Sequence, residues 1–263
     1  MAEAPKRFNT RLTMDDYLAA CSELDIETSV FVEVNAADGS HVAEAAVVER
    51  QAQMANGRLG GIVARAPVER GRAVAEDLEA LSEISHLRGI RRGVRSLDMA
   101  LDPDFIAGVK TVAEHGLIFE IGVVHWAISF GLELARRCPE VPFVFDHFGT
   151  PPIKYGVVDP WRQQIRDFAA LPNVKAKVSG MLSGVDPAKW NAEQVRPYLD
   201  HAIECFGFDR IMFGSDWPML NDVTSIAGWL SLVEEVVSGS SETQKRKLFR
   251  DNAIETYRLE VRL

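Results

Sequence analysis

The chain has 263 residues, of which 47% are hydrophobic and 25% charged, as in ordinary soluble globular proteins. Its net charge of −9 argues against nucleic acid as a partner, because phosphate binding needs a basic surface. No apolar run approaches the roughly 20 residues needed to span a bilayer, and residues 1–7 lack the apolar stretch of a secretory signal. We therefore expect a cytoplasmic protein that acts on a small molecule, and a homo-oligomer remains open.

The three cysteines, Cys21, Cys138 and Cys205, lie far apart in the chain and form no C-x-x-C motif. An odd, sparse set of this kind is typical of reduced thiols in a cytoplasmic protein. We predict that all three are structural.

Short β-rich runs alternate with longer amphipathic stretches along the whole chain. The runs, in order, are Glu27–Val34, Gly60–Ala64, Leu87–Arg91, Gly116–Val124, Val141–Asp146, Asn173–Val178 and Arg210–Gly214. Their spacing is close to the roughly 30 residues of one βα unit. Runs rich in Val, Ile and Phe, without long polar alternation, indicate strands buried on both faces of a parallel sheet.

The gaps between these runs show apolar residues recurring at three and four positions, which predicts helices. The predicted helices are Tyr17–Glu23, Val42–Met54, Val68–Ser82, Asp104–His115, Ala127–Arg137, Trp161–Ala170, Asn191–Phe206 and Ser225–Ser238. Thr13 or its neighbour, with Asp16 in the first turn, provides a capping signature for the first of them. No clustered linker interrupts the pattern, so we predict one domain over 1–263, with a poorly defined segment at 1–12.

The number of repeats predicts an α/β fold of the TIM (β/α)8-barrel type with its first strand absent or replaced. Seven strand–helix units are visible, whereas a closed parallel barrel normally has eight. A helix precedes the first run, so the missing strand belongs before Tyr17, and Arg7–Leu12 is a short, polar and charged substitute. An open doubly wound sheet is the alternative, but no Gly-rich phosphate turn follows Val34.

Catalytic groups of a parallel barrel lie at the carboxyl ends of its strands. The polar and aromatic candidates at these ends are Arg91, Arg92, Arg95, His125, His147, Asp216 and Trp217. A carboxylate such as Asp216 is costly to bury unless it is paired, hydrogen-bonded or bound to a metal, which favours a functional role. His125 has the alternative of being a hydrogen-bonded core residue, and the arginines that of being solvated or ion-paired. The other histidines lie on loops or helices, where we expect no catalytic role: His41, His86, His115 and His201.

Several segments together resemble the amidohydrolase-related (amidohydrolase 2) family, and within it the sugar-lactone and 2-pyrone-4,6-dicarboxylate lactonases. The segments are Phe143–Pro151, Trp161, Leu171–Gly180 and Arg210–Pro218, supported by Leu87–Arg91 and Asn252–Tyr257. The combination of the three main blocks is specific, whereas any one block alone is not. The resemblance extends from about Thr13 to Tyr257.

The resemblance implies roles for individual residues. His147 matches a catalytic or metal-binding histidine, and Asp216 matches the aspartate that activates the hydrolytic water. Arg91 matches an arginine that contacts substrate carboxylate or carbonyl groups, and His125 stands where substrate or metal contacts often lie. The expected substrate-binding residues are Arg91, His125, Arg95 and Trp217.

One departure from the family concerns its first strand, which carries a His-x-His pair, because this chain has no histidine before His41. Either the chain begins late or the ligands have been lost. Unpaired strand edges favour the first view, since each buried unpaired backbone group costs about 1–3 kcal/mol. A catalytic zinc usually has three protein ligands. No cofactor is therefore firmly expected, and zinc or manganese on His147, Asp216 and His125 would bind weakly at most.

These features together predict a hydrolase that opens a small carboxylated or hydroxylated lactone, in carbohydrate or aromatic catabolism. Asp216 would activate water, and His147 would polarise the carbonyl oxygen or bind a metal that does so. Arg91 would hold a substrate carboxylate through a bidentate pair. Two alternatives remain open: a decarboxylase of the same superfamily, and an incomplete or inactive homologue with a binding role. Substrate identity depends on the loops at 152–159 and 181–190.

Overall fold

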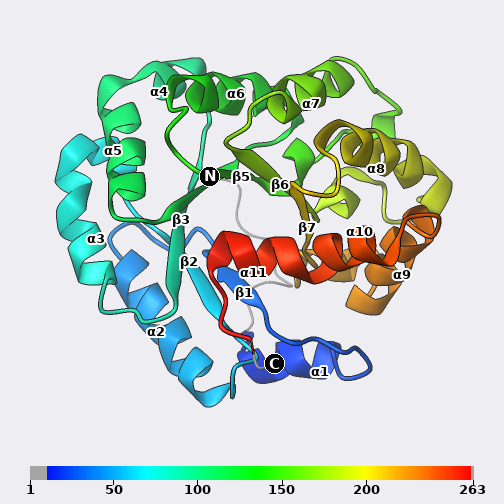
Figure 1. The fold of residues 1–263 in the computed structure, drawn as a ribbon, viewed down its shortest axis with the longest axis horizontal. Helices are drawn as coiled ribbons and strands as arrows, with labels where there is room; N and C mark the ends of the chain where they lie inside the picture. The colour runs from blue at the N-terminus through cyan, green and yellow to red at the C-terminus, as the bar shows by residue number, and fades with distance from the viewer. Residues whose placement is uncertain (1–10, 262–263) are drawn as a thin grey trace.

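The computed structural model describes residues 11–261 and contains one curled sheet of seven parallel strands. Each strand is hydrogen-bonded to the next one along the chain, and the sheet curls into most of a barrel (Figure 1). The strands are β1 (Val30–Val32), β2 (Gly61–Arg65), β3 (Leu87–Gly93), β4 (Ile118–Gly122), β5 (Phe143–Phe145), β6 (Val174–Val178) and β7 (Ile211–Phe213).

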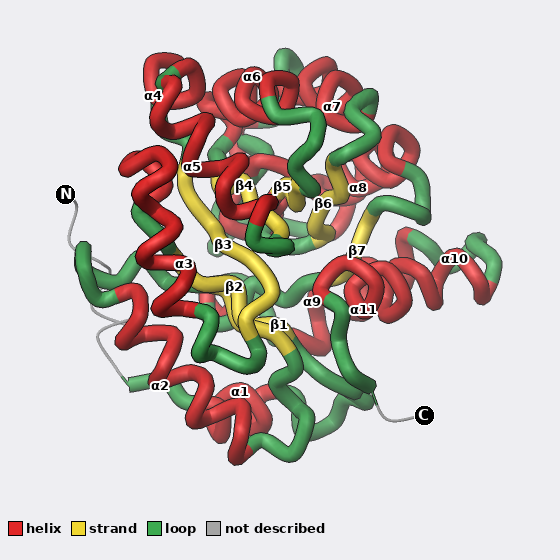
Figure 2. The backbone as a smooth tube through the Cα atoms, turned by 60° about the vertical axis from the view of Figure 1, so that its left-hand side comes forward, coloured by secondary structure: helices red, strands yellow, loops and turns green. Residues whose placement is uncertain are grey.

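Helices surround the sheet on its outer face, as the tube view shows (Figure 2). The α-helices are α1 (Met14–Ala20), α2 (His41–Met54), α3 (Ala75–Leu81), α4 (Leu97–Leu101), α5 (Pro103–Glu114), α6 (Ile128–Arg137), α7 (Trp161–Ala169), α8 (Ala192–Phe206), α9 (Ile226–Val236), α10 (Glu242–Arg246) and α11 (Asn252–Tyr257). Short 3-10 helices follow several strands, at η2 (Val68–Val74), η3 (His125–Ala127), η4 (Asp146–Gly149), η5 (Ile153–Tyr155), η6 (Met181–Gly184) and η7 (Met219–Asp222), and a π-helical turn, η8 (Lys247–Asp251), precedes α11. No helix within residues 11–261 combines the length and apolar character needed to cross a membrane.

The predicted TIM-barrel-type α/β fold with seven visible βα units is confirmed. All seven predicted strands are present, although most are shorter than the apolar runs that predicted them. Over residues 11–261, β1 and β7 remain the two edges of the sheet and no strand pairs between them. Most of the segment Arg7–Leu12, considered above as a substitute strand, lies outside the described residues.

The prediction of one helix over Val68–Ser82 is wrong. The segment is divided into η2 and α3, and Gly71 inside η2 has a φ of 62°, which breaks the helical path. A left-handed residue at this position is compatible with glycine, whereas any side chain here would press on Asp104 of α5. The amphipathic pattern continues across the break, so it does not reveal it. The helices α4, α10 and α11 were not among the predicted helices.

Two aromatic side chains lie close to the two free edges of the sheet. Tyr17 on α1 accepts a hydrogen bond from Ser29 Oγ at 3.0 Å, directly before β1, and its ring meets that of Trp217, after β7, at 5.5 Å. Tyr257 at the end of α11 packs with Leu259 in a small apolar cluster with side chains of β2, β4, β5 and β7. Residues from both ends of the described chain thus stabilise the part of the barrel where the sheet is open.

Candidate active site

The turn after β5 holds His147 in an uncommon backbone conformation. Four successive residues have positive φ: His147 (57°), Phe148 (47°), Gly149 (69°) and Thr150 (47°). Each non-glycine residue in this region costs of order 1–3 kcal/mol, and such residues concentrate at functional sites. Trp161 Nε1 at the start of α7 donates a hydrogen bond to the carbonyl of Phe148 at 2.8 Å. The buried indole therefore holds a strained turn in place.

The turn after β7 repeats this arrangement around Asp216, which has a φ of 57°. Here Trp229 Nε1 on α9 donates to the carbonyl of Gly214 at 3.0 Å. The hydroxyl of Ser215 accepts from the backbone N–H of Trp217 at 3.2 Å. Both predicted catalytic residues thus lie in left-handed turns that a buried tryptophan anchors through one hydrogen bond.

The two turns bring His147 and Asp216 together, as predicted from their places at the strand ends. His147 Nε2 lies 3.6 Å from Asp216 Oδ1, which is too long for a direct hydrogen bond. Their side chains are 21% and 19% exposed, so both are partly accessible from solvent. On its other side, the ring makes a 2.7 Å hydrogen bond between Nδ1 and Ser179 Oγ.

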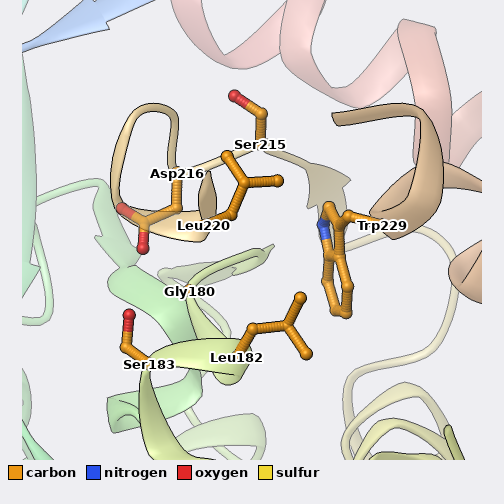
Figure 3. A pocket seen from close by; sticks show the side chains of 7 residues that line it. All are labelled: Gly180, Leu182, Ser183, Ser215, Asp216, Leu220 and Trp229. Carbon is orange, nitrogen blue, oxygen red and sulfur yellow. The ribbon is translucent and has the colours of Figure 1, made fainter. Parts of the chain in front are cut away.

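A small hollow lies next to Asp216 (Figure 3). Its lining consists of Gly180, Leu182, Ser183, Ser215, Asp216, Leu220 and Trp229. The side chains of Leu182, Leu220 and Trp229 gather on one side, and the Asp216 carboxylate lies on the other, where it points toward Ser183 (Figure 3). The three apolar side chains pack beside the loop of Asp216, and the Asp216 carboxylate also faces His147.

Beneath these turns, five charged residues form what we call the interior ion cluster: Glu33, Arg91, Glu120, Asp146 and Lys177. Arg91 Nε donates to Asp146 Oδ2 at 2.7 Å, and Arg91 Nη1 lies 3.1 Å from Glu33 Oε1. Lys177 Nζ lies 2.6 Å from Glu120 Oε2 and 3.1 Å from Asp146 Oδ1. Every member except Arg91 is buried.

Burial and neighbouring charges act in opposite directions on this cluster. For Asp146, burial raises the pKa, but Lys177 and Arg91 lower it more, so that it lies well below the usual range. Burial lowers the pKa of Lys177, but Asp146 and Glu120 raise it above its ordinary value. Burial raises the pKa of Glu120 despite the neighbouring ammonium group. The phenol of Tyr257, which donates to Glu120 Oε1 at 2.6 Å, has a pKa raised by the same burial.

The predicted substrate-binding residues are arranged in three different ways. Arg91 belongs to the interior ion cluster with Nε and Nη1 in use, so only Nη2 has no hydrogen-bond partner among residues 11–261. Arg95 is exposed after β3 and His125 is half-buried after β4, and neither makes a side-chain hydrogen bond within the described part. Trp217 packs edge-on against Tyr17. Substrate binding by these four residues remains a prediction.

Ion pairs or hydrogen bonds within the fold account for the remaining histidines. His41 lies 3.0 Å from Asp77, and His86 lies 3.0 Å from Glu49. His115 bonds to the carbonyl of Thr111, and His201 to that of Arg162. The three cysteines are free thiols, as predicted.

The sequence interpretation overlooked most of the interior ion cluster and also Ser179. Glu33 directly follows β1, Glu120 lies within β4 and Lys177 lies within β6, and a charged residue among the apolar residues of these segments is the signal that was available. A charged side chain in or next to a buried strand is costly unless it is paired, so several of them in different strands predict contacts inside the barrel. Ser179 carries no comparable signal, because serine is common after strands.

His147 and Asp216 provide fewer donor groups than a tightly bound metal ion needs. Within residues 11–261, no group of three or more His, Cys, Asp or Glu side chains could hold a metal ion. His147 and Asp216 provide two donors, whereas a catalytic zinc usually has three protein ligands. The described residues therefore do not fit a tightly bound metal.

A model of the amidohydrolase family matches residues 2–259 of this chain. L-fucono-1,5-lactonase of Burkholderia ambifaria is 30% identical over 195 residues, which cover 70% of this chain and 66% of that protein. The matched segments span 58% and 66% of the lengths of the first two curated relatives.

Solved structures share the architecture at lower sequence identity. An amidohydrolase from Burkholderia multivorans with bound zinc superposes with a TM-score of 0.87 at 24% identity, over 97% of this chain and 91% of that one. The 2,6-dihydroxybenzoate decarboxylase from Rhizobium superposes with a TM-score of 0.67 at 16% identity, over 94% and 88% of the two chains. At these identities the likeness establishes the fold alone.

Proposed function

The chain belongs to the amidohydrolase family, and on that premise we propose that it hydrolyses a small lactone, a cyclic ester. The observation that carries the proposal is the pair formed by His147 and Asp216 at the carboxyl ends of β5 and β7. Their facing atoms are 3.6 Å apart, and both residues lie in strained, tryptophan-anchored turns. A base and a hydrogen-bond donor held this close can act on one ester group. The lactonase among the curated relatives supports the same reaction class.

In the proposed reaction, Asp216 takes a proton from a water molecule as the water oxygen forms a bond to the lactone carbonyl carbon. His147 donates a hydrogen bond to the carbonyl oxygen, where negative charge develops. Collapse of this intermediate breaks the ring C–O bond, and the proton held by Asp216 passes to the departing alkoxide. One water is consumed, and the products are the carboxyl and hydroxyl ends of the opened ring.

The charge around the site supports a substrate that carries a carboxylate or several hydroxyls. Arg91 Nη2 can donate to such groups while Asp146 and Glu33 hold the rest of its guanidinium. Arg95, exposed after β3, can pair with a carboxylate at the mouth of the barrel. The bidentate pair that the sequence predicts for Arg91 is unsupported at Nε and Nη1, because both already have partners.

The test is turnover of L-fucono-1,5-lactone and a panel of related sugar lactones, measured as acid release above the uncatalysed rate. Asp216→Asn keeps the size of the side chain and tolerates a positive φ, but it removes the base. A general base contributes roughly 10²–10⁴-fold, so we expect kcat to fall by at least about 100-fold. The matched control is Asp209→Asn, at an exposed aspartate that pairs with Lys247, and its kcat should equal that of the wild type.

Three outcomes would contradict the proposal. Equal turnover by the Asp216→Asn variant would remove the aspartate from the mechanism. Release of CO2 from an aromatic acid, with no lactone opened, would favour the decarboxylase alternative, for which the structural likeness to a decarboxylase is the supporting observation. A wild-type chain that opens no lactone would favour a binding role.

A further inference from the structure

Ser179 and Gly180, directly after β6, form a socket for the His147 ring. The ring lies so close to Gly180 that a Cβ added there would stand 2.4 Å from His147 Cγ. Gly180 also has a φ of 61°, a conformation that favours glycine. Ser179 is 1% exposed and packs against Gly214, the residue that leads into the turn of Asp216. The socket therefore lies between the two turns that carry the site.

The direction of the hydrogen bond between Ser179 and His147 follows from the surrounding atoms. Among residues 11–261, His147 Nδ1 is the one side-chain hydrogen-bond partner of Ser179 Oγ. If Nδ1 carried the ring proton, the buried hydroxyl proton would have no acceptor, at a cost of about 1–3 kcal/mol. The lone pair of Nε2 would also face Asp216 Oδ1, so that two acceptors would oppose each other.

We propose that Ser179 is a positioning residue that donates its hydroxyl proton to His147 Nδ1 and so holds the ring as its Nε2–H tautomer. In this state the Nε2–H points to the space beside Asp216, where a reacting group would lie. The hydroxyl acts only through the ring, because its burial keeps it away from substrate.

This inference deepens the proposed function, and its chemical consequence rests on that function. The Nε2–H tautomer is the one that can donate to a carbonyl oxygen while Asp216 stays free to accept a proton from water. The opposite tautomer would place a lone pair of Nε2 against the carbonyl oxygen and repel it. A ring that can rotate would lose the same donor.

The experiment reads the tautomer directly, without substrate. The protein is labelled with ¹⁵N-histidine, and the two ring nitrogens of His147 are identified from the signals that vanish in His147→Gln. Spectra are recorded at several pH values on the alkaline side of the range in which histidine rings ordinarily titrate. We expect a protonated Nε2 and an unprotonated Nδ1 in the wild type. In Ser179→Ala, we expect both nitrogens to move toward the averaged shifts of a free, exchanging imidazole.

Kinetics provide a second reading through variants of Ser179. Ser179→Ala should lower kcat about 10-fold or more with little change in KM. Cysteine has a similar shape and is a weak hydrogen-bond donor, so the kcat of Ser179→Cys should lie between those of Ser179→Ala and the wild type. The control is Ser82→Ala, which removes a hydrogen bond to the carbonyl of Glu79 on α3 but leaves His147 untouched. Its nitrogen shifts and kcat should match those of the wild type.

A wild-type ring protonated on Nδ1 would overturn the inference, whatever the activity. Unchanged His147 shifts in a folded Ser179→Ala protein would also overturn it. Because the spectra need no turnover, the inference can hold even if lactone hydrolysis fails, and it can fail while hydrolysis is observed.

Discussion

Lys177 Nζ and Asp146 Oδ1 lie 3.1 Å apart inside the barrel, and Asp146 is the residue directly before His147. The interior ion cluster and the candidate site therefore share one short segment at the end of β5. Arg91 reaches the other oxygen of Asp146 at 2.7 Å, so cations from β3 and β6 hold the segment from both sides. Substitutions in the cluster should change stability and the geometry of the site together.

Replacing Lys177 with Met should destabilise the fold by about 3–5 kcal/mol, because it leaves Glu120 and Asp146 buried without their shared cation. The double variant Lys177→Met/Glu120→Gln removes one of the two carboxylates and should recover part of that loss. The coupling free energy between Lys177 and Glu120 follows from urea unfolding of four proteins: the wild type, Lys177→Met, Glu120→Gln and the double variant.

The control for this cycle is Lys175→Met on the same strand, where the lysine pairs with the exposed Glu255. A largely solvated pair contributes about 0–1 kcal/mol, so this variant should stay close to the wild type. Equal losses at the two lysines would show that the buried pairing is not what stabilises β6.

Variants of Arg91 and Arg95 should distinguish an effect on the stability of the fold from an effect on substrate binding. Arg91→Met removes the shared partner of Asp146 and Glu33 and should lower the free energy of unfolding by about 3–5 kcal/mol. Arg95→Met changes an exposed side chain, so its stability should stay within about 0.5 kcal/mol. If Arg95 pairs with a substrate carboxylate, its variant should instead raise KM for lactones that carry one. An unchanged KM for such a lactone, in a folded Arg95→Met protein, would exclude that role.

The free energy of unfolding should depend on pH through the ionisation of Asp146. Its pKa in the folded protein lies below the ordinary value, so its contribution is present above about pH 4 and is lost as the pH falls toward the folded pKa. The free energy of unfolding should therefore decrease from pH 5 to pH 3 in the wild type. In Asp146→Asn this contribution is already missing, so the gap between the two proteins should narrow over the same range. If the difference in free energy of unfolding between the two proteins stays constant from pH 5 to pH 3, other carboxyl groups cause the loss of stability in acid.

Tight metal binding is not expected from the described donor set, because His147 and Asp216 supply two ligands and no third His, Cys, Asp or Glu of residues 11–261 joins them. After dialysis against a chelator and then against zinc, elemental analysis should find well under one tightly held zinc per chain. Stoichiometric zinc that survives dialysis would contradict this expectation. His147→Gln then identifies whether that histidine is a ligand.

The fold and the two central residues could be predicted from the sequence because both depend on local patterns. Apolar runs about 30 residues apart predict βα units, and residues at the strand ends, such as His147 and Asp216, then converge on one rim. Partners across the barrel could not be predicted in this way. The contact of Arg91 with Glu33 joins residues 58 positions apart, and its geometry depends on strand register and curl, which periodicity does not report. The helix break at Gly71 could not be predicted, because one residue with positive φ leaves the apolar pattern intact.

Variants of Trp161 and Trp229 test the two turns of the proposed site, because each indole N–H makes one hydrogen bond to a backbone carbonyl of such a turn. Phenylalanine preserves much of the buried ring but leaves the carbonyl of Phe148 or of Gly214 without its donor. We expect each variant to lose about 1–3 kcal/mol of stability. The kcat of each folded variant should also fall, since a misplacement of about 1 Å can cost roughly 100-fold in rate.

The control for both tryptophans is Thr111→Val on α5, which removes a hydrogen bond from a buried side chain to the carbonyl of Ala107. It should show a loss of stability of similar size with kcat unchanged. If Trp161→Phe and Trp229→Phe behave like this control, the indole hydrogen bonds stabilise the fold without positioning the site. A selective fall in kcat would instead show that the strained turns of His147 and Asp216 depend on these two anchors.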